Sequence, residues 1–238
     1  NYSEQFSLTD SERTDLARIS LEQMAGRRPV IVTISHFSTE IVVARALEAQ
    51  TMGASMVMMM PPYHGVGLVP SEETIFEQFR AVNDAISIPI MLQDAPISGA
   101  QLSVPFLTRM ARDLENLSYF KMECPFAAEK LATLIASAGP FIAGPFDGEE
   151  AVTLLADLDA GATGTMTSGL LPEHIRQIVV AHLSGQSDVA LKKWTECLPL
   201  INHENRQCGL RACKAVYAEG GVIRSDFVRH PLNQLSNR

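Results

Sequence analysis

The chain has 238 residues, of which 46% are hydrophobic, so it can bury a sizeable core in one large domain or two small ones. Its formal net charge is −8 and its basic residues are scattered, which argues against a nucleic-acid partner. No stretch approaches the roughly 18 consecutive apolar residues of a membrane span, and no signal peptide begins the sequence, so we expect a cytoplasmic protein without a membrane partner.

Short apolar runs alternate with helical patterns and predict six strands. The runs cover residues 30–34, 56–60, 89–93, 119–123, 141–146 and 164–168. The run Met56-Val57-Met58-Met59-Met60 has no polar position, which is typical of a parallel strand covered on both faces. Thr9 and Glu12 form a capping-box pattern before a helix that we expect to end at Gly26, and Ser38 opens a second helix.

The alternation of strand and helix, without a glycine-rich nucleotide loop, favours an α/β fold of the TIM (β/α)8 barrel type. We expect residues 1–171 to form the barrel, as strands 3 to 8, and residues 172–238 to form a C-terminal helical extension. A complete barrel would need two earlier strands, so we expect the sequence to be part of a longer chain. The alternative is an incomplete, non-catalytic barrel with exposed sheet edges.

Lys121 lies within an apolar strand pattern, and Glu123 follows it on the same face of the strand. Apolar surroundings favour the neutral form of a lysine, and a neutral amine can attack a carbonyl carbon. This pattern points to a lysine that forms a Schiff base. The alternative is an edge-strand lysine whose ammonium group reaches water beside Glu123.

The active site of a TIM-type barrel lies at the C-terminal ends of its strands. The polar residues predicted at that end are Asn1, Ser3, Glu4, Ser35, His36, Tyr63, Gln93, Asp94, Lys121, Glu123, Asp147, Thr167 and Ser168. Lys121 is the only lysine among them, which favours imine chemistry. The four cysteines form no Cys-x-x-Cys pair and the six histidines no His-Glu-x-x-His motif, so we expect no metal site.

Several motifs resemble those of the dihydrodipicolinate synthase and N-acetylneuraminate lyase superfamily, the pyruvate-type class I aldolases and dehydratases. The motifs are Asn1-Tyr2-Ser3-Glu4, Met60-Pro61-Pro62-Tyr63, Phe120-Lys121-Met122-Glu123 and Gly161-Ala162-Thr163-Gly164, and the resemblance covers nearly the whole chain. It implies a barrel of the class I aldolase type in which Lys121 carries the Schiff base. It also implies that no metal or dissociable cofactor is needed, and that the protein is a homotetramer or homodimer.

Some motifs depart from the usual superfamily pattern, and these departures indicate which subgroup the chain resembles. In Gln93-Asp94-Ala95-Pro96, Gln93 stands where synthases and lyases usually have a proton-relay tyrosine. This stretch and Phe146-Asp147-Gly148-Glu149-Glu150 are similar to those of sugar-acid dehydratases. The resemblance therefore implies dehydration of a 2-keto-3-deoxy sugar acid, with 2-keto-3-deoxy-L-arabonate as the expected substrate and 2-oxoglutarate semialdehyde as the product. The alternative is an aldolase that uses the same lysine and releases pyruvate.

The resemblance also implies roles for the other site residues. Glu123 is expected to move protons during the reaction, or else to pair with Lys121 as a structural ion pair. Tyr63 is expected to relay protons or to close a neighbouring subunit's site; otherwise it is an ordinary loop tyrosine. The partner is a small anionic keto acid. We expect Asn1, Tyr2 and Ser3 to bind its carboxylate, unless they form a plain loop. We expect its other groups to contact His36, Gln93, Asp147, Thr167 and Ser168, with a structural histidine as the alternative for His36.

Overall fold

A computed structural model describes residues 4–63 and 68–235 of the chain, so Asn1, Tyr2 and Ser3 lie outside the described residues. Six parallel strands form one sheet in sequential order: β1 (Ile31–Thr33), β2 (Met56–Met59), β3 (Ile90–Asp94), β4 (Leu117–Met122), β5 (Gly144–Asp147) and β6 (Gly164–Thr165). The predicted strands and their parallel order are confirmed. Within the described residues the sheet is an open arc, because β1 and β6 do not pair with each other.

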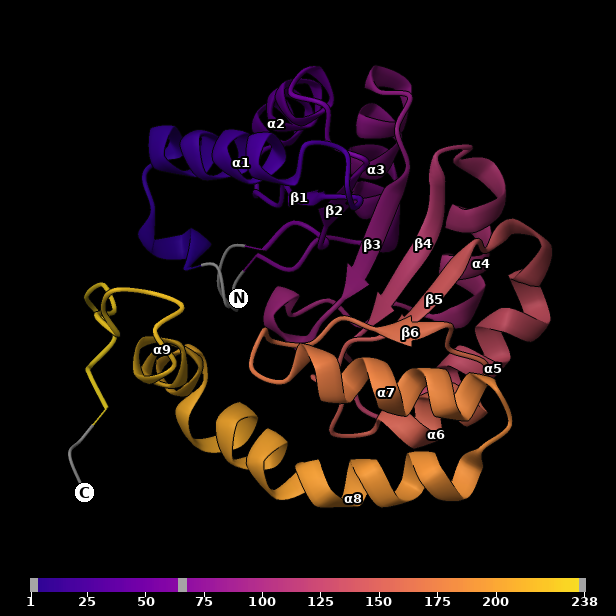
Figure 1. Cartoon of the computed structure of the whole chain (residues 1–238). Helices are drawn as coiled ribbons and strands as arrows, with labels where there is room; N and C mark the ends of the chain where they lie inside the picture. The colour runs from indigo at the N-terminus through magenta and orange to yellow at the C-terminus, as the bar shows by residue number, and fades with distance from the viewer. Residues whose placement is uncertain (1–3, 64–67, 236–238) are drawn as a thin grey trace.

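Helices connect the strands and cover the sheet (Figure 1). They are α1 (Asp10–Met24), α2 (Thr39–Thr51), α3 (Glu72–Ala85), α4 (Val104–Asp113), α5 (Ala127–Ala138) and α6 (Leu154–Asp159), with short 3-10 turns at Gln5–Ser7, Pro96–Ser98 and Gly139–Phe141. The predicted capping box of Thr9 and Glu12 is confirmed. The helix ends two residues before Gly26, because Ala25 already adopts the left-handed conformation.

Two predicted strand boundaries are wrong by three residues. The strand expected at residues 164–168 ends at Thr165. Residues 141–146 were expected to be a single strand, but Phe141 belongs to a 3-10 turn and the strand begins at Gly144. Pro140 explains the difference, since proline has no N–H for a strand ladder and its fixed φ suits the first turn of a helix.

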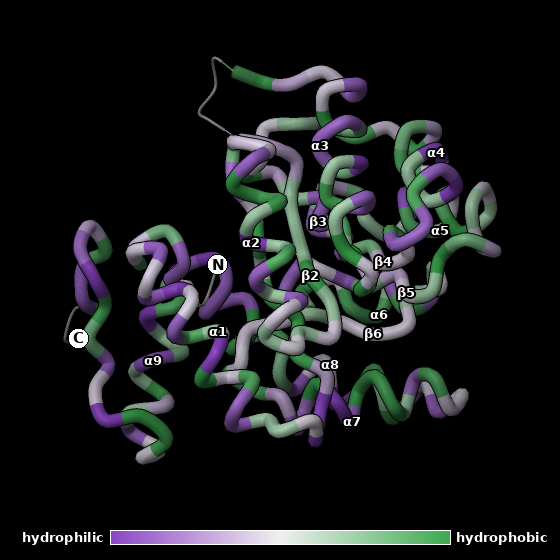
Figure 2. Tube along the Cα trace, turned by 90° about the horizontal axis from the view of Figure 1, so that it is seen from above, coloured by the Kyte–Doolittle hydropathy of each residue, from purple (hydrophilic) through white to green (hydrophobic). Residues whose placement is uncertain are grey.

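The two faces of the sheet have separate apolar clusters. The larger cluster lies between the sheet and the helices; α3, for example, contributes Ile75, Phe76, Phe79 and Val82 at helical spacing. Figure 2 shows that α3 and α4 carry hydrophobic and hydrophilic residues together, as expected for helices buried on one side. The smaller cluster lies on the other face and consists of Met56, Met58 and Met91, packed against Tyr119, Phe146 and Met166. By the alternation of strand side chains, this second face also carries Lys121.

The C-terminal part of the chain is helical. It contains α7 (Pro172–Leu183), α8 (Ser187–His203), a π-helical turn (Glu204–Cys208) and α9 (Leu210–Glu219). The segment then returns to the beginning of the chain (Figure 1), where Lys214 pairs with Glu4 at 2.9 Å and Arg229 with Glu12 at 2.6 Å. The division into barrel and extension at residue 171 stays a prediction. Among residues 4–63 and 68–235, no helix combines the length and apolar character needed to cross a bilayer.

Candidate active site

Lys121 lies in β4, at the centre of the described sheet. The strand register places it beside Gln93 of β3 and Phe146 of β5. The residue is 7% exposed, and its Nζ lies 3.3 Å from Glu123 Oε2. The structure thus brings Lys121 and Glu123 together, as their spacing predicts. The alternative of an edge-strand lysine does not fit this arrangement, because β4 has a neighbour on each side.

Glu123 is fixed from two directions. Its backbone N–H donates to the Asp94 carbonyl oxygen at 2.9 Å, and its Oε2 accepts a hydrogen bond from Gln93 Nε2 at 2.6 Å. Gln93 therefore orients the carboxylate that pairs with Lys121. The other amide atom, Gln93 Oε1, is buried and has no hydrogen-bond partner in the described part of the chain. A buried polar atom without a partner is unusual.

Glu150 is a residue of this site that the sequence analysis missed. It lies in the loop after β5 and has a φ of 55°, and the next residue, Ala151, has a φ of 69°. Burial raises the pKa of Glu150 to about 7; Lys121 opposes this rise, whereas Glu123 and Glu204 add to it. Glu150 Oε2 is buried and has no hydrogen-bond partner among the described residues. A carboxyl group with a pKa near neutrality, between a lysine and a second carboxylate, is suited to general acid–base chemistry.

Asp147 shapes the loop that carries Glu150. The Asp147 carboxylate accepts hydrogen bonds from the backbone N–H groups of Glu149 at 3.0 Å and Ala151 at 3.1 Å, and from the Thr165 hydroxyl. Asp147 is 0% exposed, so its side chain offers no accessible surface to a substrate. The structure therefore gives Asp147 contacts that support this loop, and its expected contact with substrate stays a prediction.

Thr167 and Ser168 follow β6 and lie beside Glu150. The Ser168 backbone N–H faces the Glu150 carboxyl group. The Thr167 hydroxyl donates to the Ser168 carbonyl oxygen at 2.8 Å, and the Ser168 hydroxyl donates to Glu204 Oε2 at 2.9 Å. Glu204 is 3% exposed and belongs to the π-helical turn. No local sequence pattern predicts this contact, because 36 residues separate Ser168 from Glu204.

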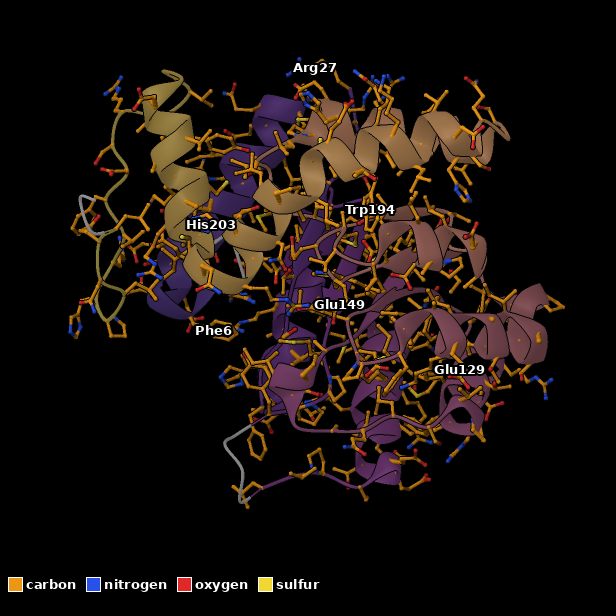
Figure 3. The ribbon with its side chains drawn as sticks, turned by 90° about the horizontal axis from the view of Figure 1, so that it is seen from below. Phe6, Arg27, Glu129, Glu149, Trp194 and His203 are labelled. Atoms are coloured by element: carbon orange, nitrogen blue, oxygen red, sulfur yellow. The ribbon has the colours of Figure 1, made fainter. Side chains whose placement is uncertain are left out.

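The C-terminal helices also hold the loop of Glu150 (Figure 3). Trp194 of α8 donates from Nε1 to the Ala151 carbonyl oxygen at 2.9 Å. Arg206 of the π-helical turn pairs with Glu149 Oε2 at 2.7 Å. Together with the bond between Ser168 and Glu204, these contacts make the helical segment a structural part of the candidate site.

Tyr63 and His36 lie in a different place. They line a pocket of about 290 Å³ with Gln5, Phe6, Leu8, Thr9, Asp10, Arg13, Ser35 and Arg45. Burial lowers the pKa of His36, with a further contribution from Arg45, and His36 Nδ1 accepts a hydrogen bond from the Ser38 N–H at 3.0 Å. Burial raises the pKa of Tyr63, whose ring packs edge-on against Phe6. Lys121 is not part of this lining, and the expected roles of Tyr63 and His36 in the reaction stay predictions.

Cysteine and metal chemistry are the remaining possibilities at the site. Burial and the neighbouring Asp94 raise the pKa of Cys124 to about 12, which makes its thiol unreactive. Residues 4–63 and 68–235 contain no group of three or more His, Cys, Asp or Glu side chains arranged to hold a metal ion. The expectation that the reaction needs no metal or cofactor stays a prediction.

A family profile described as the dihydrodipicolinate synthetase family matches residues 3–238, nearly the whole chain. The chain belongs to the dihydrodipicolinate synthetase family. It is 57% identical over 235 residues to the L-2-keto-3-deoxyarabonate dehydratase of Azospirillum brasilense. The alignment covers 99% of this chain and 76% of that protein. It is also 29% identical to a 4-hydroxy-tetrahydrodipicolinate synthase of Afipia carboxidovorans, over 97% of this chain and 76% of the relative.

Solved structures of the dihydrodipicolinate synthetase family have the same fold. Dihydrodipicolinate synthase from Aquifex aeolicus superposes with a TM-score of 0.91 at 20% identity, over 99% of this chain and 79% of that one. The predicted family is therefore confirmed, and the predicted α/β architecture of the TIM-barrel type is confirmed in broad terms.

Proposed function

We propose that this member of the dihydrodipicolinate synthetase family is a hydro-lyase that converts 2-keto-3-deoxy-L-arabonate into 2-oxoglutarate semialdehyde and water. The buried pair of Lys121 and Glu123, 3.3 Å apart and beside Glu150, is the observation that supports this proposal most strongly. The substrate is proposed from the 57% identical relative, which is named for this dehydration.

The proposed reaction begins at Lys121. Its neutral amine attacks the C2 keto carbon, water leaves, and a protonated imine forms. The imine withdraws electrons and acidifies the C3 methylene. Loss of a C3 proton gives an enamine, which expels the C4 hydroxyl as water once that hydroxyl receives a proton. Loss of water leaves a protonated imine conjugated to a C3–C4 double bond, and removal of a C5 proton then gives a dienamine that bears an enol at C5. Protonation at C3 restores the protonated imine, the enol tautomerises to the aldehyde by protonation at C4, and hydrolysis of the imine frees Lys121.

Two carboxyl groups divide the proton transfers in this proposal. Glu123 lies beside the Lys121 amine and is held by Gln93, so it is placed to take the C3 proton. Glu150 has its pKa raised by burial to about 7 and is therefore substantially protonated at neutral pH, which suits it to give a proton to the leaving hydroxyl. No metal or dissociable cofactor takes part in these steps. The cytoplasmic location and the homotetramer or homodimer stay predictions.

A product assay tests the proposed function against the aldolase alternative. An aldolase would break the C3–C4 bond and release pyruvate, whereas the dehydratase forms a semialdehyde with the same carbon skeleton as the substrate. We expect purified protein incubated with 2-keto-3-deoxy-L-arabonate to form 2-oxoglutarate semialdehyde and no stoichiometric pyruvate. Stoichiometric pyruvate with an aldehyde fragment would replace the dehydratase by an aldolase. A folded protein that forms neither product would exclude both activities on this substrate.

Gly148 provides a test of how closely Lys121 must be positioned. A Cβ at this position would lie 2.7 Å from the Met122 carbonyl oxygen and 2.9 Å from Lys121 Cγ, so Gly148→Ala requires β4 to shift. We expect kcat to fall roughly 10- to 100-fold, because small displacements of reacting groups are costly. The control is Gly139→Ala, whose Cβ would make only an ordinary contact at 3.9 Å. Equal kcat values for the two variants would show that this close packing does not control Lys121.

A further inference from the structure

Two buried carboxyl groups lie under the loop that carries Glu150. Asp147 at the end of β5 and Asp157 in α6 are both 0% exposed. The two side chains are close enough to share a hydrogen bond, which requires that one of them carries a proton. Two ionised carboxylates in contact and away from water would be strongly disfavoured. A single shared proton removes most of this cost.

The surrounding donors decide which group holds the proton. Asp147 accepts bonds from two backbone N–H groups and from the Thr165 hydroxyl, so both of its carboxyl oxygens already serve as acceptors. Asp157 Oδ2 accepts one bond, from the Thr153 hydroxyl at 2.6 Å. Asp157 Oδ1 is buried, and no donor of the described residues reaches it. The proton therefore belongs on Asp157, which can then act as a donor toward Asp147.

The charged groups around Asp157 agree with this assignment. Burial raises the pKa of Asp157 to about 7; the Thr153 hydrogen bond opposes this rise, whereas Asp147 and Glu149 add to it. The neighbouring α5 presents the buried apolar residues Leu131 and Leu134. The nearby basic side chains have other partners: His182 of α7 pairs with Asp159 at 3.4 Å, and Arg206 of the π-helical turn pairs with Glu149. None of these contacts supplies a cation directly to Asp157.

We propose that Asp157 is a positioning residue, whose proton is donated to Asp147 and thereby holds the loop of residues 148–151 with Glu150 in the active site. The inference rests on the proposed function only for the role of Glu150. Asp147 binds the N–H groups of Glu149 and Ala151, on both sides of Glu150, so a change in the carboxyl pair acts directly on this loop. When the shared proton leaves, repulsion between two buried anions displaces the loop.

The sequence contains one tryptophan, Trp194, and it is bonded to this same loop through the Ala151 carbonyl oxygen. Tryptophan fluorescence can therefore report the position of the loop without any substrate. We expect the fluorescence of the wild-type protein to change in a titration through about pH 7, where the carboxyl pair loses its proton. The transition should disappear in Asp157→Asn, because an amide donates to Asp147 and accepts from Thr153 at every pH.

Control variants separate this effect from other titrations. Glu129→Gln removes an exposed carboxylate of α5 and should leave the transition unchanged. Glu150→Gln should also keep it, since the transition belongs to Asp147 and Asp157. In activity assays near neutral pH we expect Asp157→Asn to stay within about twofold of wild type and Asp157→Ala to lose roughly tenfold or more in kcat, since only the amide replaces the donor.

The outcomes distinguish this inference from the proposed function. A transition that persists in Asp157→Asn, or that disappears in Glu150→Gln, would overturn it. If Asp157→Asn does not fold, infrared spectra of Glu150→Gln decide instead, because this variant lacks the other buried carboxyl group whose pKa is about 7. A buried carboxylic acid band must be present below about pH 7 and lost above it. Absence of that band overturns the inference. If the fluorescence and infrared results are as expected but no semialdehyde forms, the proposed function is wrong, whereas the inference about Asp147 and Asp157 is supported.

Discussion

Replacing Lys121 by methionine is expected to lower kcat by at least about 10⁴-fold, because the variant has no amine to form the imine on which every later step depends. Lys121 is 7% exposed, and methionine fills a similar volume without a charge. We therefore expect Lys121→Met to stay folded. The measurement is kcat for semialdehyde formation, together with a thermal unfolding curve.

Lys130 supplies a matched control. It is the other lysine of this region with a close carboxylate partner, since its Nζ lies 2.6 Å from the buried Asp94. Lys130→Met leaves that carboxylate unpaired, so we expect a lower Tm with kcat within about tenfold of wild type. A Lys121→Met variant that kept kcat within tenfold of wild type would show that the reaction does not use Lys121 as its nucleophile.

Replacing Glu150 by glutamine has the second-largest expected effect, a loss in kcat of roughly 10²- to 10⁴-fold, since an amide cannot give a proton to the leaving hydroxyl. Burial raises the pKa of Glu150 to about 7. Because the protonated form is the active one, wild-type kcat/KM should fall as pH rises through about 7. The residual activity of Glu150→Gln should lack this fall.

The same raised pKa affects stability. A carboxyl group whose pKa is higher in the folded protein stabilises the fold at low pH and loses that contribution as pH rises through about 7. Between acidic and alkaline pH, the Tm of Glu150→Gln should therefore fall less than the Tm of the wild-type protein. Glu149→Gln is the control, since Glu149 pairs with Arg206 and should keep kcat within about tenfold. Wild-type kcat in Glu150→Gln would remove Glu150 from the mechanism.

The sequence predicts the parts of this site that depend on regular local patterns. The apolar run at residues 56–60 corresponds to a strand whose residues are all buried between two apolar clusters. Strand alternation alone places Lys121 and Glu123 on one face, and the structure brings them to 3.3 Å. The parallel order of the strands follows from the alternation of strand and helix.

The parts that could not be predicted depend on irregular backbone or on distant contacts. Glu150 follows a strand, but strand alternation stops at Asp147, and two successive residues with positive φ then turn the loop. Positive φ in residues other than glycine has no clear sequence signal. Glu204 reaches Ser168 from a π-helical turn, which helical periodicity does not anticipate. The pocket of Tyr63 and His36 could not be predicted either, since it is formed by α1, α2 and the loops that follow β1 and β2.

Borohydride trapping tests the central role of Lys121 most directly. Reduction during incubation with 2-keto-3-deoxy-L-arabonate converts any imine into a stable amine, and peptide mass mapping then locates it. The account predicts a substrate-derived adduct on Lys121, formed together with 2-oxoglutarate semialdehyde, and no adduct in Lys121→Met. No adduct on folded, active protein, or an adduct on a lysine other than Lys121, would contradict it.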